Sequence, residues 1–170
     1  MLDTAVINEG WGEAVDWDML SSAAAAAAVA ATPYALLAHI PARVEIAVRL
    51  TSDAEVQRLN AVYRHKDKPT NVLSFPMLDA QELKEMADSS AEDIPAEMML
   101  GDVVLAEGVC ATEAADKGVP VEAHAAHLIV HGVLHLLSYD HIGDEEALAM
   151  ESIERRVLAD LGLHDPYGDE

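Results

Sequence analysis

The stretch that decides how this chain folds and works is His131-Gly132-Val133-Leu134-His135-Leu136-Leu137-Ser138-Tyr139-Asp140-His141. His131 and His135 are four residues apart, so on a helix both imidazoles leave the same face. The chain then has enough length to turn and bring in His141. Three imidazoles with an open fourth position are typical of a catalytic zinc site. The stretch therefore predicts one Zn²⁺ ion per chain, held by His131, His135 and His141 on a long helix and the turn after it.

The helix expected over residues 121–137 carries two further histidines, His124 and His127. At 3.6 residues per turn, the four histidines from His124 to His135 fall within an arc of roughly 80°. They extend over about 16 Å of helix, so they cannot all bind one ion. We interpret His127 as a residue that binds substrate or supports a ligand, although plain packing also fits its position.

The spacing of the three histidines equals that of the zinc peptidase motif H-E-x-x-H-x-x-G-x-x-H. Gly132 stands where that motif has the glutamate that activates zinc-bound water. Ser138 stands where it has the turn glycine. A left-handed turn at Ser138 costs about 1 kcal/mol relative to glycine. We expect the turn to persist because metal binding outweighs this cost.

Outward from this stretch, helical and strand periodicities alternate along the chain. Residues 77–99 are acidic and weakly patterned, and we expect a surface loop there with at most one helical turn near residues 81–87. A length of 170 residues suits one domain over residues 1–170. Strands are predicted at 4–8, 43–50, 71–75 and 101–106, and helices at 16–31, 52–64, 107–117, 121–137 and 144–162.

The formal charge is −21, from 31 acidic and 10 basic residues. Such a charge argues against a protein that coats nucleic acid without specificity. Three of the basic residues form a small island, Arg64, Lys66 and Lys68. Arginine offers a planar fork suited to a phosphate, and the lysines add point charges. We interpret Arg64 as catalytic and the two lysines as substrate-binding, while solvation of a turn also explains them.

Two aspartates are candidates for holding a metal ligand in place. Asp140 lies next to His141 and could accept a hydrogen bond from the second ring nitrogen of a ligand, or it could form a turn. Asp102 opens a predicted strand after Gly101 and could orient a ligand or a loop.

The remaining signals concern the compartment. Cys110 is the only cysteine, so no intrachain disulfide can form, and its apolar context predicts a buried thiol. The N-terminus carries acidic residues where a signal peptide needs positive charge. The apolar run 23–31 ends at Pro33, well short of a bilayer span. We expect a soluble cytoplasmic protein with no membrane partner.

Three segments together resemble the YbeY endoribonuclease family, the bacterial rRNA maturation factors. They are Tyr63-Arg64-His65-Lys66-Asp67-Lys68-Pro69-Thr70-Asn71-Val72-Leu73-Ser74-Phe75-Pro76, Leu100-Gly101-Asp102, and His131 through His141. They occur in the order of the family, and the resemblance covers roughly residues 40–165. Ser138 departs from it, since the family usually has glycine there.

The resemblance implies a single α+β domain, with a small mixed four-stranded sheet packed with about five helices. It implies a zinc ion on His131, His135 and His141, and an arginine at Arg64 that is needed to cleave RNA. The implied role is maturation of the 3′ end of small-subunit 16S rRNA and ribosome quality control. The implied partners are ribosomal RNA and the small ribosomal subunit with its proteins, and not DNA.

Two other functions stay open on the sequence alone. A zinc peptidase-like hydrolase is favoured by the histidine spacing and opposed by Gly132. A non-catalytic ribosome-assembly factor with a structural metal is favoured by the acidic charge, which suits docking on basic ribosomal proteins.

Overall fold

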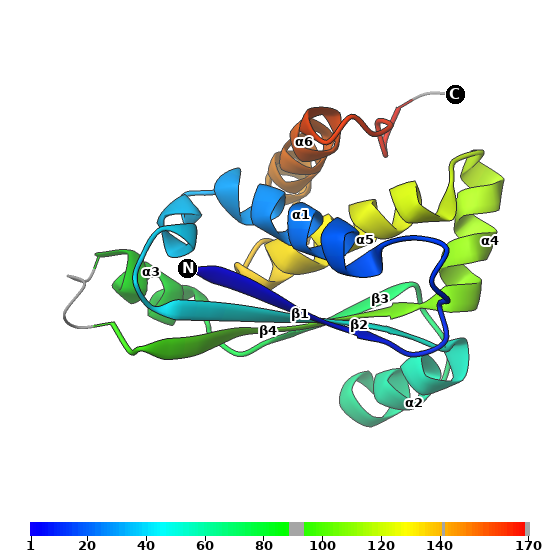
Figure 1. Cartoon of the computed structure of the whole chain (residues 1–170), viewed down its shortest axis with the longest axis horizontal. Helices are drawn as coiled ribbons and strands as arrows, with labels where there is room; N and C mark the ends of the chain where they lie inside the picture. Colours follow the sequence, from blue (N-terminus) through cyan, green and yellow to red (C-terminus); the bar gives the residue numbers. More distant parts are fainter. Residues whose placement is uncertain (89–93, 141, 169–170) are drawn as a thin grey trace.

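A computed structural model describes residues 1–88, 94–140 and 142–168. Four strands form one mixed sheet in the order β1-β2-β4-β3 (Figure 1). β1 (Leu2–Asn8), β2 (Arg43–Thr51) and β4 (Glu97–Ala106) are parallel, and β3 (Val72–Pro76) runs antiparallel to β4 at the edge. This arrangement confirms the predicted α+β fold with a small mixed sheet.

The described residues form six α-helices and one short 3₁₀ helix, where about five helices were expected. Three of the helices, α1, α5 and α6, lie on one side of the sheet, and α2 lies on the other (Figure 1). The elements are α1 (Trp17–Ala30), η1 (Ala35–Ala38), α2 (Asp53–Arg64), α3 (Ala80–Asp88), α4 (Glu107–Lys117), α5 (Val121–Leu136) and α6 (Asp144–Asp160).

α5 is the central helix of the core. It packs between α1 and the sheet, and it also contacts α4 and α6. Its side chains Ile129, Val130, Val133 and Leu134 are fully buried. A helix that is apolar on nearly every side is stable only when it is covered on several sides. The histidines of α5 are therefore held on a rigid, enclosed element.

Local signals explain where α2 begins. The hydroxyl of Ser52 accepts a hydrogen bond from the backbone N–H of Glu55 and thereby caps the helix. The carboxylate of Glu55 pairs with Arg49 and Arg58. α2 ends at Arg64, because His65 adopts the left-handed conformation with φ of 59°. Val56 and Leu59 form a small core with β3 and β4 on the outer face of the sheet.

The structure corrects the expectation for residues 77–99. β4 begins at Glu97, four residues before the predicted start, and Gly101 lies inside the strand directly after Leu100, the residue that the register with β2 skips. α3 spans nine residues rather than one turn. Asp79 and Glu82 bond reciprocally to each other's backbone N–H groups, which makes a capping box. Leu83 of α3 is fully buried in the core.

The structure can be compared with two further expectations, the burial of Cys110 and the apolar run that is too short to span a bilayer. Cys110 is buried as predicted, and its burial raises the pKa of the thiol to about 12. Within the described ranges, no helix combines the length and the apolar character needed to cross a bilayer.

Candidate active site

His131 and His135 direct one ring nitrogen each toward the other. The two Nε2 atoms are 3.1 Å apart. The Nδ1 atom of His131 lies 2.5 Å from Oε1 of Glu154, and that of His135 lies 2.9 Å from the backbone oxygen of Tyr139. Since both acceptors are oxygens without a proton to give, each Nδ1 is the donor, which leaves Nε2 as the atom of each ring that can bind a metal.

The distance between the two Nε2 atoms tests whether a metal fits between the rings. Two nitrogens at 2.0–2.1 Å from one tetrahedral zinc are roughly 3.3 Å apart. The observed separation is close to this value, so the two imidazoles fit a zinc ion on their Nε2 side.

The partner of His131 is Glu154, which lies 23 residues further along the chain on α6. Glu154 is completely buried. Its Oε2 accepts a hydrogen bond from the hydroxyl of Tyr167 at 2.5 Å. Burial alone would raise the pKa of Glu154, but contacts with His127, His131 and Tyr167 lower it to about 2. The carboxylate is therefore ionised, and it holds the ring of His131 in one orientation.

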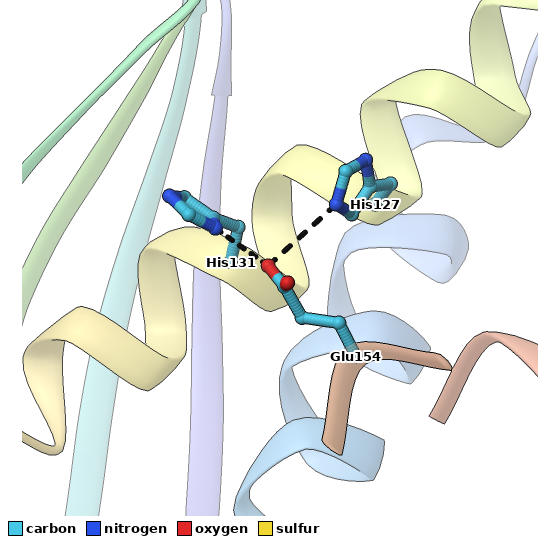
Figure 2. Close-up of side chains that lie close together, drawn as sticks. All are labelled: His127, His131 and Glu154. Carbon is cyan, nitrogen blue, oxygen red and sulfur yellow. Dashed lines mark hydrogen bonds and ion pairs between the residues drawn. The ribbon is translucent and has the colours of Figure 1, made fainter. Parts of the chain in front are cut away.

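His127, His131 and Glu154 form a compact group, which Figure 2 shows with Glu154 approaching both histidines from α6. Their potential ligand atoms lie within 4.8 Å of one another, so this group could also hold a metal ion. However, 2.5 Å between His131 Nδ1 and Glu154 Oε1 is a hydrogen-bond distance. It is too short for two ligands of one tetrahedral zinc, which are roughly 3.3 Å apart. Glu154 therefore acts as the support of His131 in this conformation.

The turn after α5 brings the carbonyl of Tyr139 back to His135. Ser138 has φ of 70°, which confirms the predicted left-handed turn. The backbone N–H groups of Ser138 and Tyr139 bond to the carbonyls of His135 and Leu134, and this closes the helix. The strained conformation of Ser138 thus places the carbonyl of Tyr139 where it orients the ring of His135, a candidate metal ligand.

A cleft of about 1040 Å³ runs along β3, the edge strand, and both His131 and His135 line it. Arg64, the last residue of α2, also lines the cleft, although α2 packs on the other side of the sheet. Ser138 and Asp140, from the turn after α5, line the cleft as well. The cleft therefore combines the histidine pair with a guanidinium group around one elongated space.

Gly132, between the two histidines, lies directly against the sheet. A Cβ atom at this position would be 2.6 Å from Cγ1 of Val103 and 3.1 Å from Oγ of Ser74. The Ser74 hydroxyl donates a hydrogen bond to the carbonyl of Gly132. No larger side chain fits here without moving α5. The glutamate of the zinc peptidase motif is thus excluded at this position by packing.

Comparison with known proteins identifies the family. The sequence model described as "Endoribonuclease YbeY" matches residues 13–162. This chain belongs to the YbeY endoribonuclease family. A curated relative from Rhizorhabdus wittichii, named Endoribonuclease YbeY, is 52% identical over 168 residues, covering 98% of this chain and 97% of its own length. The relative of the same name from Sphingopyxis alaskensis is 52% identical over 160 residues, covering 94% and 93%.

A solved structure supports the fold of this YbeY-family chain. The solution structure of TM1509 from Thermotoga maritima matches it with a TM-score of 0.54 and 19% sequence identity, over 98% of this chain and 100% of that one. At this identity the likeness concerns the fold alone.

The structure places some predicted site residues of this YbeY-family chain at the cleft. Arg64, His131, His135 and Asp140 line it. The acceptors for the ring N–H groups of the two histidines are Glu154 and the Tyr139 carbonyl rather than Asp140. His141 lies outside the described residues.

Other predicted site residues are found elsewhere. His127 is 6% exposed and does not line the cleft, and its role in binding substrate stays a prediction. It packs beside Glu154 and the ring of Tyr167. Lys66 and Lys68 are exposed and follow the end of α2, but they do not line the cleft either.

Asp102 also lies away from the cleft, and its role in orienting a ligand or a loop stays a prediction. Side chains alternate along a strand, and since Val103 faces α5, Asp102 faces the other side of the sheet. It lies there in a separate pocket with Arg49 and Phe75, remote from the histidine pair.

Sequence reasoning missed Glu154 and Tyr167. Glu154 follows Met150 by four residues and precedes Val157 by three, so it lies on the buried stripe of α6. A single acid on an apolar stripe is the signal that could have identified Glu154, because buried carboxylates need partners.

Proposed function

We propose that this protein is a zinc-dependent endoribonuclease that cleaves single-stranded regions of ribosomal RNA. Its target is the 3′ end of 16S rRNA during maturation, and the same activity serves ribosome quality control. The observation that carries the proposal is the pair of converging Nε2 atoms of His131 and His135 in a cleft that Arg64 also lines. Membership of the YbeY endoribonuclease family supports the choice of RNA as substrate.

The zinc ion is held in this proposal by His131, His135 and His141. When bound, zinc supplies a Lewis acid and lowers the pKa of a bound water, which suits hydrolysis of a phosphodiester. Glu154 and the Tyr139 carbonyl keep the two described rings in the tautomer that presents Nε2. The protein thereby prepares the ligands before the metal arrives.

Arg64 binds a phosphate of the RNA in this proposal. Three other arginines, Arg43, Arg49 and Arg58, are paired with carboxylates. Among the residues that the structure describes, no carboxylate forms an ion pair with Arg64. Its guanidinium is thus available for the charge that develops on a phosphodiester in the transition state. Lys66 and Lys68, outside the cleft, guide the RNA toward it.

The acidic remainder of the chain limits RNA contact to this small region. A charge of −21 repels a polyanion over most of the surface. Docking on basic proteins of the small ribosomal subunit overcomes that repulsion in the cytoplasm. All of residues 1–170 act as one endoribonuclease domain in this proposal.

The test uses purified protein with two substrates, a 16S-derived RNA with a single-stranded 3′ extension and an unstructured peptide. Each is incubated with zinc and with excess chelator. We expect cleavage of the RNA alone, abolished by chelator and restored by zinc. Cleavage of the peptide would favour the peptidase, and zinc binding without any RNA cleavage would favour the assembly factor. Either result would overturn the proposed activity.

A further inference from the structure

The segment that follows α6 folds back and reaches the rear of the histidine site. Tyr167 inserts its hydroxyl to within 2.5 Å of Oε2 of Glu154. Its ring meets the ring of His127 edge-on, with centroids 5.7 Å apart and planes at 86°. Tyr167 thus contacts two residues of the buried group from a part of the chain that carries no sequence motif.

The neighbour of Glu154 on α6 fixes this segment in place. Arg155 donates from Nη2 to the backbone oxygen of Tyr167 at 3.1 Å, and its Nε lies 3.3 Å from Oδ1 of Asp165. Its guanidinium also lies over the Tyr167 ring, 5.6 Å from the centroid. Asp165 in turn accepts a hydrogen bond from the backbone N–H of Tyr167. The position of the tyrosine is therefore determined by several contacts besides its own hydroxyl.

The hydroxyl matters because a buried carboxylate has two oxygens to satisfy. Oε1 of Glu154 bonds to Nδ1 of His131, and Oε2 bonds to Tyr167. Without the hydroxyl, Oε2 would be buried and unpaired, which is costly for a charged group. The carboxylate would then lower its free energy by rotating or by bonding to a water molecule that enters the site. Either change weakens its hold on His131.

We propose that Tyr167 is a positioning residue for the metal centre, acting through Glu154 on the ring of His131. The inference rests on the proposed function, because it takes His131 to be a zinc ligand through Nε2. The chain of contacts runs from the C-terminal segment through α6 to α5, and it ends on the face of His131 opposite the cleft.

The test compares Tyr167→Phe with Tyr34→Phe. Both variants remove one phenol hydroxyl from a partly buried ring, and Tyr34 packs against the core, whereas the hydroxyl of Tyr167 bonds to Glu154. Zinc affinity is measured by competition with a chromophoric chelator. Loss of the direct partner of a metal ligand lowers affinity by about 10–100-fold. Tyr167 acts one contact further out, so we expect a loss at the low end of this range, about 10-fold, in Tyr167→Phe and none in Tyr34→Phe.

Two further readouts separate positioning from a general contribution to stability. The visible spectrum of the cobalt-loaded protein should change in Tyr167→Phe, because the orientation of one ligand changes. In RNA cleavage kcat should fall while KM stays close to that of the wild type, since Tyr167 does not line the cleft.

A double-mutant cycle with Glu154→Gln tests the route of the effect. Tyr167→Phe should have little further effect on zinc affinity in that background, because residues in one network are not additive. Unchanged zinc affinity and cobalt spectrum in Tyr167→Phe, in a wild type that binds zinc and cleaves RNA, would overturn the inference alone. A wild type that binds no zinc would overturn the proposed metal centre as well.

Discussion

Replacing Gly132 by alanine tests how closely α5 lies on the sheet. The new Cβ would be 2.6 Å from Cγ1 of Val103, whereas carbon atoms in contact are about 3.5–4.0 Å apart. Val103 is fully buried on β4, and rotation of its β-branched side chain is restricted, so turning away is costly. About 1 Å of overlap must be absorbed by moving the helix or the strand.

The change in the free energy of unfolding follows from two opposing effects of the substitution. Overpacking of a well-packed core costs about 1–3 kcal/mol, and the rigidity of Val103 places this site in the upper part of that range. Alanine in place of glycine inside a helix returns about 1 kcal/mol. We therefore expect Gly132→Ala to lower the free energy of unfolding by about 1–2 kcal/mol.

The assay is urea unfolding in the presence of chelator, so that metal binding does not contribute. The matched variant is Val103→Ala, which removes Cγ1 and by itself costs about 2 kcal/mol. In the double variant the new methyl group occupies the space that Val103 gives up. The combined loss should be smaller than the sum of the single losses by about 1 kcal/mol. A Gly132→Ala protein as stable as the wild type, or strictly additive losses, would refute the packing argument against a peptidase glutamate.

Four further results are expected. Arg64→Ala should keep its zinc and its melting temperature but cleave RNA about 10²–10³-fold more slowly, and Arg64→Lys should recover only part of the rate in the same gel assay. His131→Ala should lose zinc by elemental analysis, and its melting temperature should fall to that of the chelated wild type. Ser138→Gly should raise the free energy of unfolding by about 1 kcal/mol, because glycine accepts φ of 70° without strain. Cys110 should resist thiol reagents until the protein is unfolded in denaturant, since burial raises its pKa to about 12.

The helix that carries the histidines was predictable, because its signal is local. The four-residue spacing of His131 and His135 places them on one face whatever the rest of the fold is. The turn at Ser138 was predictable for the same reason, since the third histidine requires the chain to reverse. The edge strand β3 and the cap at Ser52 also follow from short patterns.

The supporting residues could not be located from spacing. Glu154 meets His131 only because α6 packs on α5, and Tyr167 meets Glu154 only because the chain folds back after α6. The face of β4 that Asp102 occupies depends on the bulge at Leu100 and on the alternation of side chains, which residue spacing does not fix.

Which residues of the basic island line the cleft also could not be predicted from their spacing. Arg64 and Lys66 are two residues apart in the sequence, but α2 ends between them at His65. The left-handed residue at the end of the helix turns the chain, so that Arg64 lines the cleft and Lys66 does not. Closeness in the sequence thus predicted a group of positive charges, but it did not predict that only Arg64 of the two residues lines the cleft.

The location of zinc tests the central claim most directly. Crystals of the zinc-loaded protein, measured at the zinc absorption edge, should show one strong anomalous peak on the cleft side of α5. We expect Nε2 of both His131 and His135 to coordinate this ion, while Nδ1 of His131 still bonds to Glu154. A peak instead among His127, Nδ1 of His131 and Glu154, away from Arg64, would contradict the proposed active site.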